Sequence, residues 1–180
     1  MYNKAGFKKV LKESIKGPVF AVVGGDDYVT VVSSHALWQI QRRQYAELVQ
    51  PVTLREAPEP GEVQQWGSRV SKTWDEWQEF LSWMYGNSGP AVITDFILSA
   101  AGEDHVMTVP IRIFATDNGP IGIDEKYINA LDVAVVGFQR SGLDIVAGNS
   151  STRCHIMPIQ LDQSGRRMTA VKAICAEYLE

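Results

Sequence analysis

Cysteine and histidine are scarce in this chain. Of its 180 residues, two are Cys and three are His, at positions His35, His105 and His155. Two cysteines are too few for the disulfide framework of a small secreted protein. The histidines stand in no HExxH, HxH or CxxC context, so their spacing predicts no zinc site. A chain of this length buries enough apolar surface to fold without metal or disulfides.

Long apolar runs and nucleotide-binding motifs are also missing. No run approaches the roughly 20 apolar residues that cross a bilayer, which predicts a cytoplasmic protein with no membrane partner. The sequence holds no Walker-type phosphate loop, no GxGxxG and no GxSxG. With a net charge of −4, it is untypical of sequence-specific DNA-binding proteins, so we expect at most non-specific proximity to DNA. These absences favour a protein that is not an enzyme and uses no cofactor.

Composition and periodicity predict a single α+β domain over residues 1–180. Hydrophobic residues make up 45% and charged residues 21% of the chain, as in ordinary globular proteins. Helical periodicity predicts four helices, over residues 4–16, 35–49, 73–85 and 124–140. Asn3 and Thr73 are suited to cap the first and third. The β-branched run 132–138 also fits a strand, and we choose the helix because Asp124 is a suitable cap.

Three antiparallel hairpins are expected to form the sheet on which these helices pack. β-Rich segments flanking turn residues place them at 18–32, 91–115 and 153–178. Residues 52–66 include a rigid, proline-rich acidic stretch, which we expect to project as a loop or arm. In the last hairpin, a two-residue turn at Ser164-Gly165 would place Cys154 opposite Cys175. That pair would form either a strained disulfide or two thiols in the core.

Charge is unevenly distributed along the chain. Residues 1–16 sum to +4 and the remainder to −8. The positive charges belong to Lys4, Lys8, Lys9, Lys12 and Lys16. A basic helix on an acidic body is either a solvated helix face or a surface that attracts another copy of the protein, an acidic partner or nucleic acid.

The third predicted helix is rich in tryptophan. Trp74, Trp77 and Trp83 are three of the five Trp in the chain and lie within ten residues. Aromatic side chains at helical spacing form a core face or a subunit interface, and both are enriched in Trp.

Gly24-Gly25-Asp26-Asp27 resembles the GGDD motif of palm-type nucleotidyl cyclases and polymerases. That resemblance implies carboxylates holding Mg²⁺ against a nucleotide, here Asp26 and Asp27 with a distant carboxylate such as Asp95. However, a palm domain needs a preceding strand with another acidic ligand. Only 23 residues precede this motif, and Glu13 on a helix is their one acid. Glycine and aspartate also suit any tight hairpin, and we favour that interpretation.

Residues 106–180 resemble, in the order of their elements, the second half of tail-terminator and related tail-assembly proteins of bacteriophages. The matching pieces are the helix over 7–15, the strand 109–114, the helix 127–138 and the strand 168–178. If 132–138 is a strand, a tail-tube-like β-sandwich is the nearer analogy. The resemblance implies a virion ring, commonly sixfold, at the tail tube or neck. It implies no catalytic residues.

Three hypotheses follow. The first is a non-enzymatic assembly subunit of a homo-oligomeric ring, whose partners are other copies and other assembly proteins, in the cytoplasm during assembly and in the virion afterwards. Its interface would use the lysines of the first helix and the tryptophans of the third. The second is a metal-dependent phosphoester enzyme at the GGDD turn. The third is a small acidic binding or inhibitor protein.

Overall fold

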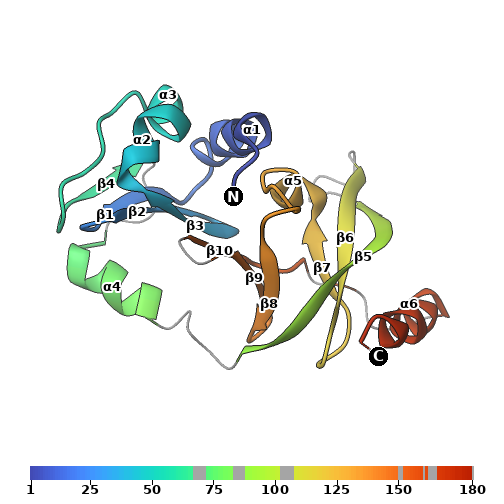
Figure 1. Cartoon of the computed structure of the whole chain (residues 1–180). Helices are drawn as coiled ribbons and strands as arrows, with labels where there is room; N and C mark the ends of the chain where they lie inside the picture. The colour runs from blue at the N-terminus through green and yellow to red at the C-terminus, as the bar shows by residue number, and fades with distance from the viewer. Residues whose placement is uncertain are drawn as a thin grey trace.

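A computed structural model describes residues 1–66, 72–82, 88–101, 108–149, 152–159, 161 and 166–179. Within these ranges, ten strands form one sheet in the order β4-β1-β2-β3-β10-β9-β8-β5-β6-β7 (Figure 1). All nine pairings between neighbouring strands are antiparallel. The six helices are short. The α+β prediction was therefore wrong, because the protein is predominantly an antiparallel sheet with short helices on its surfaces.

The N-terminal segment confirms its predicted helix and hairpin. Helix α1 (Lys4–Ser14) begins at Asn3, whose side chain accepts a hydrogen bond from the backbone N–H of Gly6 at 3.3 Å. Strands β1 (Phe20–Gly24) and β2 (Tyr28–Ser33) follow as an antiparallel pair. The apolar face of α1 is buried against this part of the sheet.

The predicted helix over 35–49 was wrong in its first half. Residues Ala36–Gln41 form strand β3, and only Arg42–Leu48 form a helix, α2. In β3, Trp38 points into the cluster beneath α1, whereas Leu37 belongs to the cluster on the other face. Because both faces of the strand are covered, its apolar residues occur consecutively, and such a run cannot be told from a helix by periodicity.

The next elements build one end of the sheet. They are α3 (Gln50–Thr53), β4 (Val63–Trp66) and α4 (Trp74–Ser82). Strand β4 pairs with β1 as the outermost strand, so part of the stretch 52–66 belongs to the sheet. Helix α4 follows its predicted cap, Thr73, whose hydroxyl oxygen accepts from the Glu76 N–H at 3.4 Å while its own N–H donates to the Glu76 carboxylate at 2.7 Å.

The central hairpin is confirmed. Strands β5 (Ser88–Ala101) and β6 (Thr108–Thr116) pair along most of their length, with a bulge between Ile93 and Ile97. Strand β7 (Ile121–Asp124) pairs with β6. The backbone N–H of Ile159 donates to the Gly122 carbonyl at 2.8 Å, so the segment that follows β10 lies against β7.

The predicted helix over 124–140 was also wrong. Asp124 is a cap as expected, since its side chain accepts from the Lys126 N–H at 3.0 Å. The helix it caps, α5, ends after one turn (Glu125–Ile128), and the chain continues into β8 (Gly137–Ser141) and β9 (Asp144–Gly148). The β-branched run therefore spans a turn and the approach to a strand.

The predicted terminal hairpin over 153–178 was wrong in its second half. Arg153–Ile156 form β10, but Arg166–Glu177 form helix α6. Cys154 lies opposite Trp38 and Ala147 in the sheet, and Cys175 lies on α6 in a different apolar cluster. Both cysteines are buried free thiols, so the predicted cross-strand pair does not exist.

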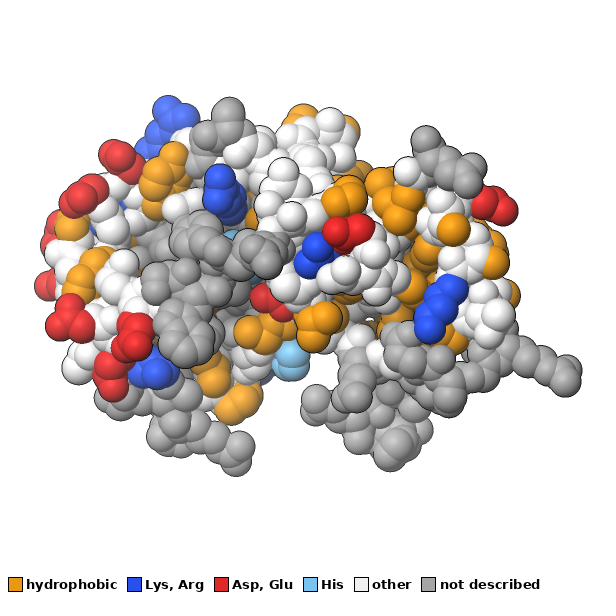
Figure 2. All heavy atoms as spheres, turned by 90° about the horizontal axis from the view of Figure 1, so that it is seen from below, with side chains coloured by type: hydrophobic (Ala, Val, Ile, Leu, Met, Phe, Trp, Pro, Cys, Tyr) orange, Lys and Arg blue, Asp and Glu red, His pale blue; other side chains and the backbone are white. Residues whose placement is uncertain are grey.

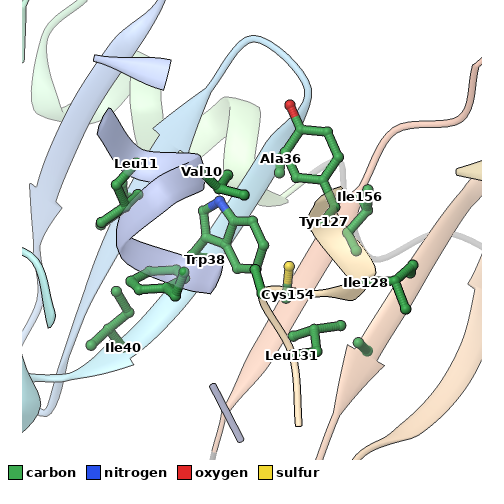
Figure 3. Packing of buried hydrophobic residues seen from close by; sticks show 14 of the residues in the cluster. Val10, Leu11, Ala36, Trp38, Ile40, Tyr127, Ile128, Leu131, Cys154 and Ile156 are labelled. Carbon is green, nitrogen blue, oxygen red and sulfur yellow. The ribbon is translucent and has the colours of Figure 1, made fainter. Parts of the chain in front are cut away.

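Three apolar clusters hold the helices to the sheet. The largest lies beneath α1, α2 and α5, and Figure 3 shows Trp38 at its centre between Val10 of α1 and Tyr127 of α5. The second joins α6 to β6, and the third joins α4 to the opposite face of β1–β3. None of the helices in the described ranges is long and apolar enough to cross a membrane.

Candidate functional site

The GGDD turn joins β1 to β2, and the loop that contains Pro58 and Glu59 packs against it. The N–H of Gly25 closes the turn by donating to the Tyr28 carbonyl at 2.9 Å. A Cβ on Gly24 would lie 2.1 Å from the Glu59 carbonyl oxygen, so the glycine is needed for the close approach of that loop. The Arg42 guanidinium donates to the carbonyls of Gly25 and Pro58 at 3.1 and 2.7 Å. These contacts give the motif a structural role.

The structure does not bring Asp95 to the two aspartates of the turn. Asp26 and Asp27 are exposed and line the hollows beside β1, β2 and α2. Asp95 lies on β5 and lines a separate cleft with Arg112 and Glu125. In the part of the chain that the structure describes, no three His, Cys, Asp or Glu side chains are arranged to hold a metal ion.

Acidic side chains gather around the GGDD turn at the β4 end of the sheet. We call this surface the acidic pole, and Figure 2 shows its carboxylates crowded at that end. Its exposed members are Asp26, Asp27, Glu56, Glu59, Glu62, Asp75, Glu76 and Glu79. Four described basic residues lie among them, namely Arg42, Arg43, Arg55 and Lys72, which leaves an excess of four negative charges among the described residues of this surface.

Helix α1 carries the opposite charge. Its buried side is formed by Phe7, Val10 and Leu11, so its lysines lie on or near the surface. Lys4 forms an ion pair with Glu47 of α2, and that contact lowers the pKa of the Glu47 carboxyl. Among residues 1–16, the exposed lysines without an ion pair to any described residue are Lys9, Lys12 and Lys16, and Lys8 is half-buried and also lacks one. We call these four side chains the lysine face.

The tryptophans of α4 serve the core more than the surface. Trp77 is 2% exposed and packs against Ala21, Val23 and Leu37 of the sheet. Trp74 is half-buried against the same cluster. Trp83 lies outside the described residues. Of the two that are described, Trp74 alone retains surface for a partner.

The described histidines lie in different surroundings. His35 is exposed at the turn between β2 and β3. His155 on β10 is 9% exposed, and burial, with the positive charge of Arg153, lowers its pKa to about 4. It is therefore neutral near pH 7 and lines a cavity of about 490 Å³ with Gln139 of β8. His105 lies outside the described residues.

A cleft beside the β5 bulge was missed by sequence reasoning. The Arg112 guanidinium donates to both carboxylate oxygens of Glu125 at 2.9 and 2.6 Å, and to the Thr94 carbonyl at 3.1 Å. The Arg112 and Glu125 side chains are 18% and 12% exposed. They form one wall of a cleft of about 630 Å³. The available signal was Arg112 itself, the one charge in an otherwise apolar strand.

Comparison with known proteins does not place the chain in a family. No protein-family model and no curated protein matches it. A solved structure of DNA polymerase III subunit beta from Borrelia burgdorferi, in complex with a natural product, aligns with 90% of this chain at 12% identity and a TM-score of 0.33. The alignment covers 64% of that protein. A likeness this low supports no argument about fold or function.

Proposed function

We propose that the protein is a non-enzymatic assembly subunit that joins other copies of itself into a ring. The observation that carries this proposal is the separation of charge on the surface. The acidic pole has an excess of four negative charges, and residues 1–16, which include α1, have an excess of four positive charges. Figure 1 places α1 over the middle of the fold and β4 and α4, which belong to the elements that carry the pole, at one end.

Contact between the acidic pole of one copy and the lysine face of the next would be heterologous, since the two surfaces differ. Heterologous contacts close into rings when the rotation between copies allows it, and otherwise extend into filaments. Complementary charge steers the encounter of the two surfaces and sets their orientation. Because exposed charges are screened within about 8 Å at physiological salt, association through them weakens as salt rises.

A phage tail or neck as the setting of this ring stays a prediction. The element order behind it differs from the structure, since 127–138 is not one helix and 168–178 is helical. The run 132–138 is not a strand either, because β8 begins only at Gly137, so the condition stated for the tail-tube-like sandwich is not met. The proposal of self-association rests on the charged surfaces alone and needs neither analogy.

The test is the solution mass of the full chain, measured by light scattering after size exclusion at two concentrations and two salt levels. We expect an oligomer at low salt that dissociates as salt or dilution increases. A monomer under every condition would overturn self-association and favour the acidic binding protein.

Charge reversal identifies the surfaces involved. Lys9→Glu with Lys12→Glu should give a monomer, and Asp26→Lys with Asp27→Lys should do the same. The variant with all four changes should associate again, because the two surfaces are complementary once more. The matched control, Arg153→Glu with Lys172→Glu, changes two exposed residues outside both surfaces and changes the net charge of the chain as much as the lysine reversal does. Equal loss of association in the control and the α1 variant would mean that net charge, rather than the lysine face, is responsible.

A further inference from the structure

Strand β5 has an edge that no described strand covers beyond its first three residues. Ser88, Gly89 and Pro90 pair with β8. From residue 91 to residue 101, the pairing found among the described residues is with β6 alone. Within this stretch the Phe96 N–H donates to the Thr94 hydroxyl oxygen and the Thr94 carbonyl accepts from Arg112. The remaining backbone N–H and C=O groups on the side away from β6 are placed to receive a further strand.

The bulge in β5 brings a carboxylate to this edge. Between the pairs Ile93–Phe114 and Ile97–Arg112, three residues of β5 face one residue of β6. A bulge of this kind redirects side chains, and here Asp95 is exposed at the rim of the cleft. Thr94 holds the bulge, since its hydroxyl donates to the Ile113 carbonyl at 2.8 Å.

The cleft has an excess of negative charge. Among the described residues that line it, the carboxylates are those of Asp95, Glu125 and Asp132, and the one cation, Arg112, is held by Glu125. Asp95 and Asp132 are exposed and form no ion pair with any residue in the described ranges. A positively charged group would therefore be attracted to the rim.

Apolar side chains surround these carboxylates. Ile93, Leu131 and Val133 line the cleft. Ile97 of β5 and Val133 and Val135 beyond α5 are 49%, 49% and 51% exposed. They are three of the seven large hydrophobic side chains that are exposed in the described part of the chain. Apolar side chains gathered on one surface are typical of interaction sites.

We propose that this edge and cleft bind an extended segment of a partner protein in which lysine or arginine alternates with apolar residues. The segment adds a strand to β5, and its backbone makes the hydrogen bonds. Its apolar side chains lie on the face of the added strand away from the cleft, where they cover Val92 of β5, which is 36% exposed. The stem of one lysine lies along Ile93 while its ammonium group reaches Asp95 and Asp132, as long cationic side chains commonly do.

The outer strand of a second copy is a poor occupant. Strand β4 is flanked by the acidic pole, so docking it here would bring carboxylates against Asp95 and Asp132. This like-charge contact disfavours the pairing. The inference is therefore independent of the proposed self-association, and its test does not depend on the oligomeric state.

The test uses the full chain and a fluorescent heptapeptide in which four valines alternate with three lysines, with binding followed by anisotropy. We expect saturable binding, and no binding when glutamate replaces lysine. Asp95→Asn with Asp132→Asn should weaken binding about tenfold, the effect of losing two surface charge contacts. Asp75→Asn with Glu79→Gln removes the same charge from the acidic pole and should leave binding unchanged.

Backbone pairing has its own readout. A peptide with N-methyl groups on alternate residues cannot donate hydrogen bonds along one edge. Two such peptides are compared, one methylated at the odd and one at the even positions. The peptide whose methyl groups lie on the edge that faces β5 should lose binding. Circular dichroism and thermal unfolding check that each variant is folded. Absence of lysine-peptide binding, or equal weakening by the two pairs of variants, would overturn the proposal.

Discussion

The ion pair between Arg112 and Glu125 is predicted to stabilise the fold through a measurable coupling. The perturbations are Arg112→Met, which keeps the aliphatic stem, and Glu125→Gln, which keeps the shape of the side chain. Glu125→Gln removes the charge that the guanidinium contacts through two of its nitrogens. Arg112 would then retain the Thr94 carbonyl as its acceptor within the cleft. Each single change therefore leaves a partly desolvated charge without its counterion.

The size of the coupling follows from exposure and geometry. With side chains 18% and 12% exposed, the pair is screened much less than a surface pair but is not fully desolvated. Bidentate geometry adds to its strength. Breaking a fully buried pair costs about 3–5 kcal/mol, and exposed pairs couple by about 0–1 kcal/mol, so we expect about 2 kcal/mol here. A destabilisation of that size would lower the Tm by about 4–8 °C in a domain of this length.

The assay is a double-mutant cycle with urea unfolding of the wild type, both single variants and the double variant. The double variant should be more stable than the sum of the single effects predicts. Lys4→Met and Glu47→Gln form the control cycle, because that pair joins side chains 64% and 53% exposed. It should show no measurable coupling. Additivity at Arg112 and Glu125, or equal coupling in both cycles, would refute the argument from burial.

Three further outcomes are expected. The pKa of His155 is 6.5 when the imidazole is free in the unfolded state, and burial in the folded state lowers it to about 4. The contribution of His155 to the free energy of unfolding should therefore be constant above pH 6.5 and fall by up to about 3 kcal/mol as the pH drops toward 4. His155→Gln should remove this dependence, as measured by urea unfolding at several pH values. Gly24→Ala should destabilise strongly, because the new Cβ would lie 2.1 Å from the Glu59 carbonyl, whereas Gly137→Ala meets its first neighbour at 3.9 Å and should be well tolerated. Thr73→Ala should cost about 1 kcal/mol through loss of the α4 cap, measured by thermal unfolding.

Local signals in the sequence predicted several elements correctly. Asn3, Thr73 and Asp124 all cap helices, because a side-chain oxygen satisfies free N–H groups with no help from the rest of the fold. The hairpins over 18–32 and 91–115 were also found, since turn residues and alternating apolar residues act over short distances.

The errors lie where long-range packing overrides local preference. Trp38 lies in a strand because its indole ring fills the space between Phe7 and Tyr127. The residues next to Trp38 in the sequence give no indication of these contacts. Likewise Cys175 lies on a helix because α6 covers the apolar face of β6. The bulge cleft could not be predicted, because Asp95 and Asp132 meet only through the pairing of β5 and the position of α5.

By itself, the sequence determined the helix caps, the tight turns, the basic first helix and the excess of acid elsewhere, all of which depend on neighbouring residues or on composition. The tertiary structure alone decided which apolar runs became strands, that the acids around Gly24, Glu59 and Asp75 share one surface, and that β5 has an open edge. The physical reason is that burial and strand pairing reward contacts between residues far apart in the chain, and those contacts exist only once the sheet has formed.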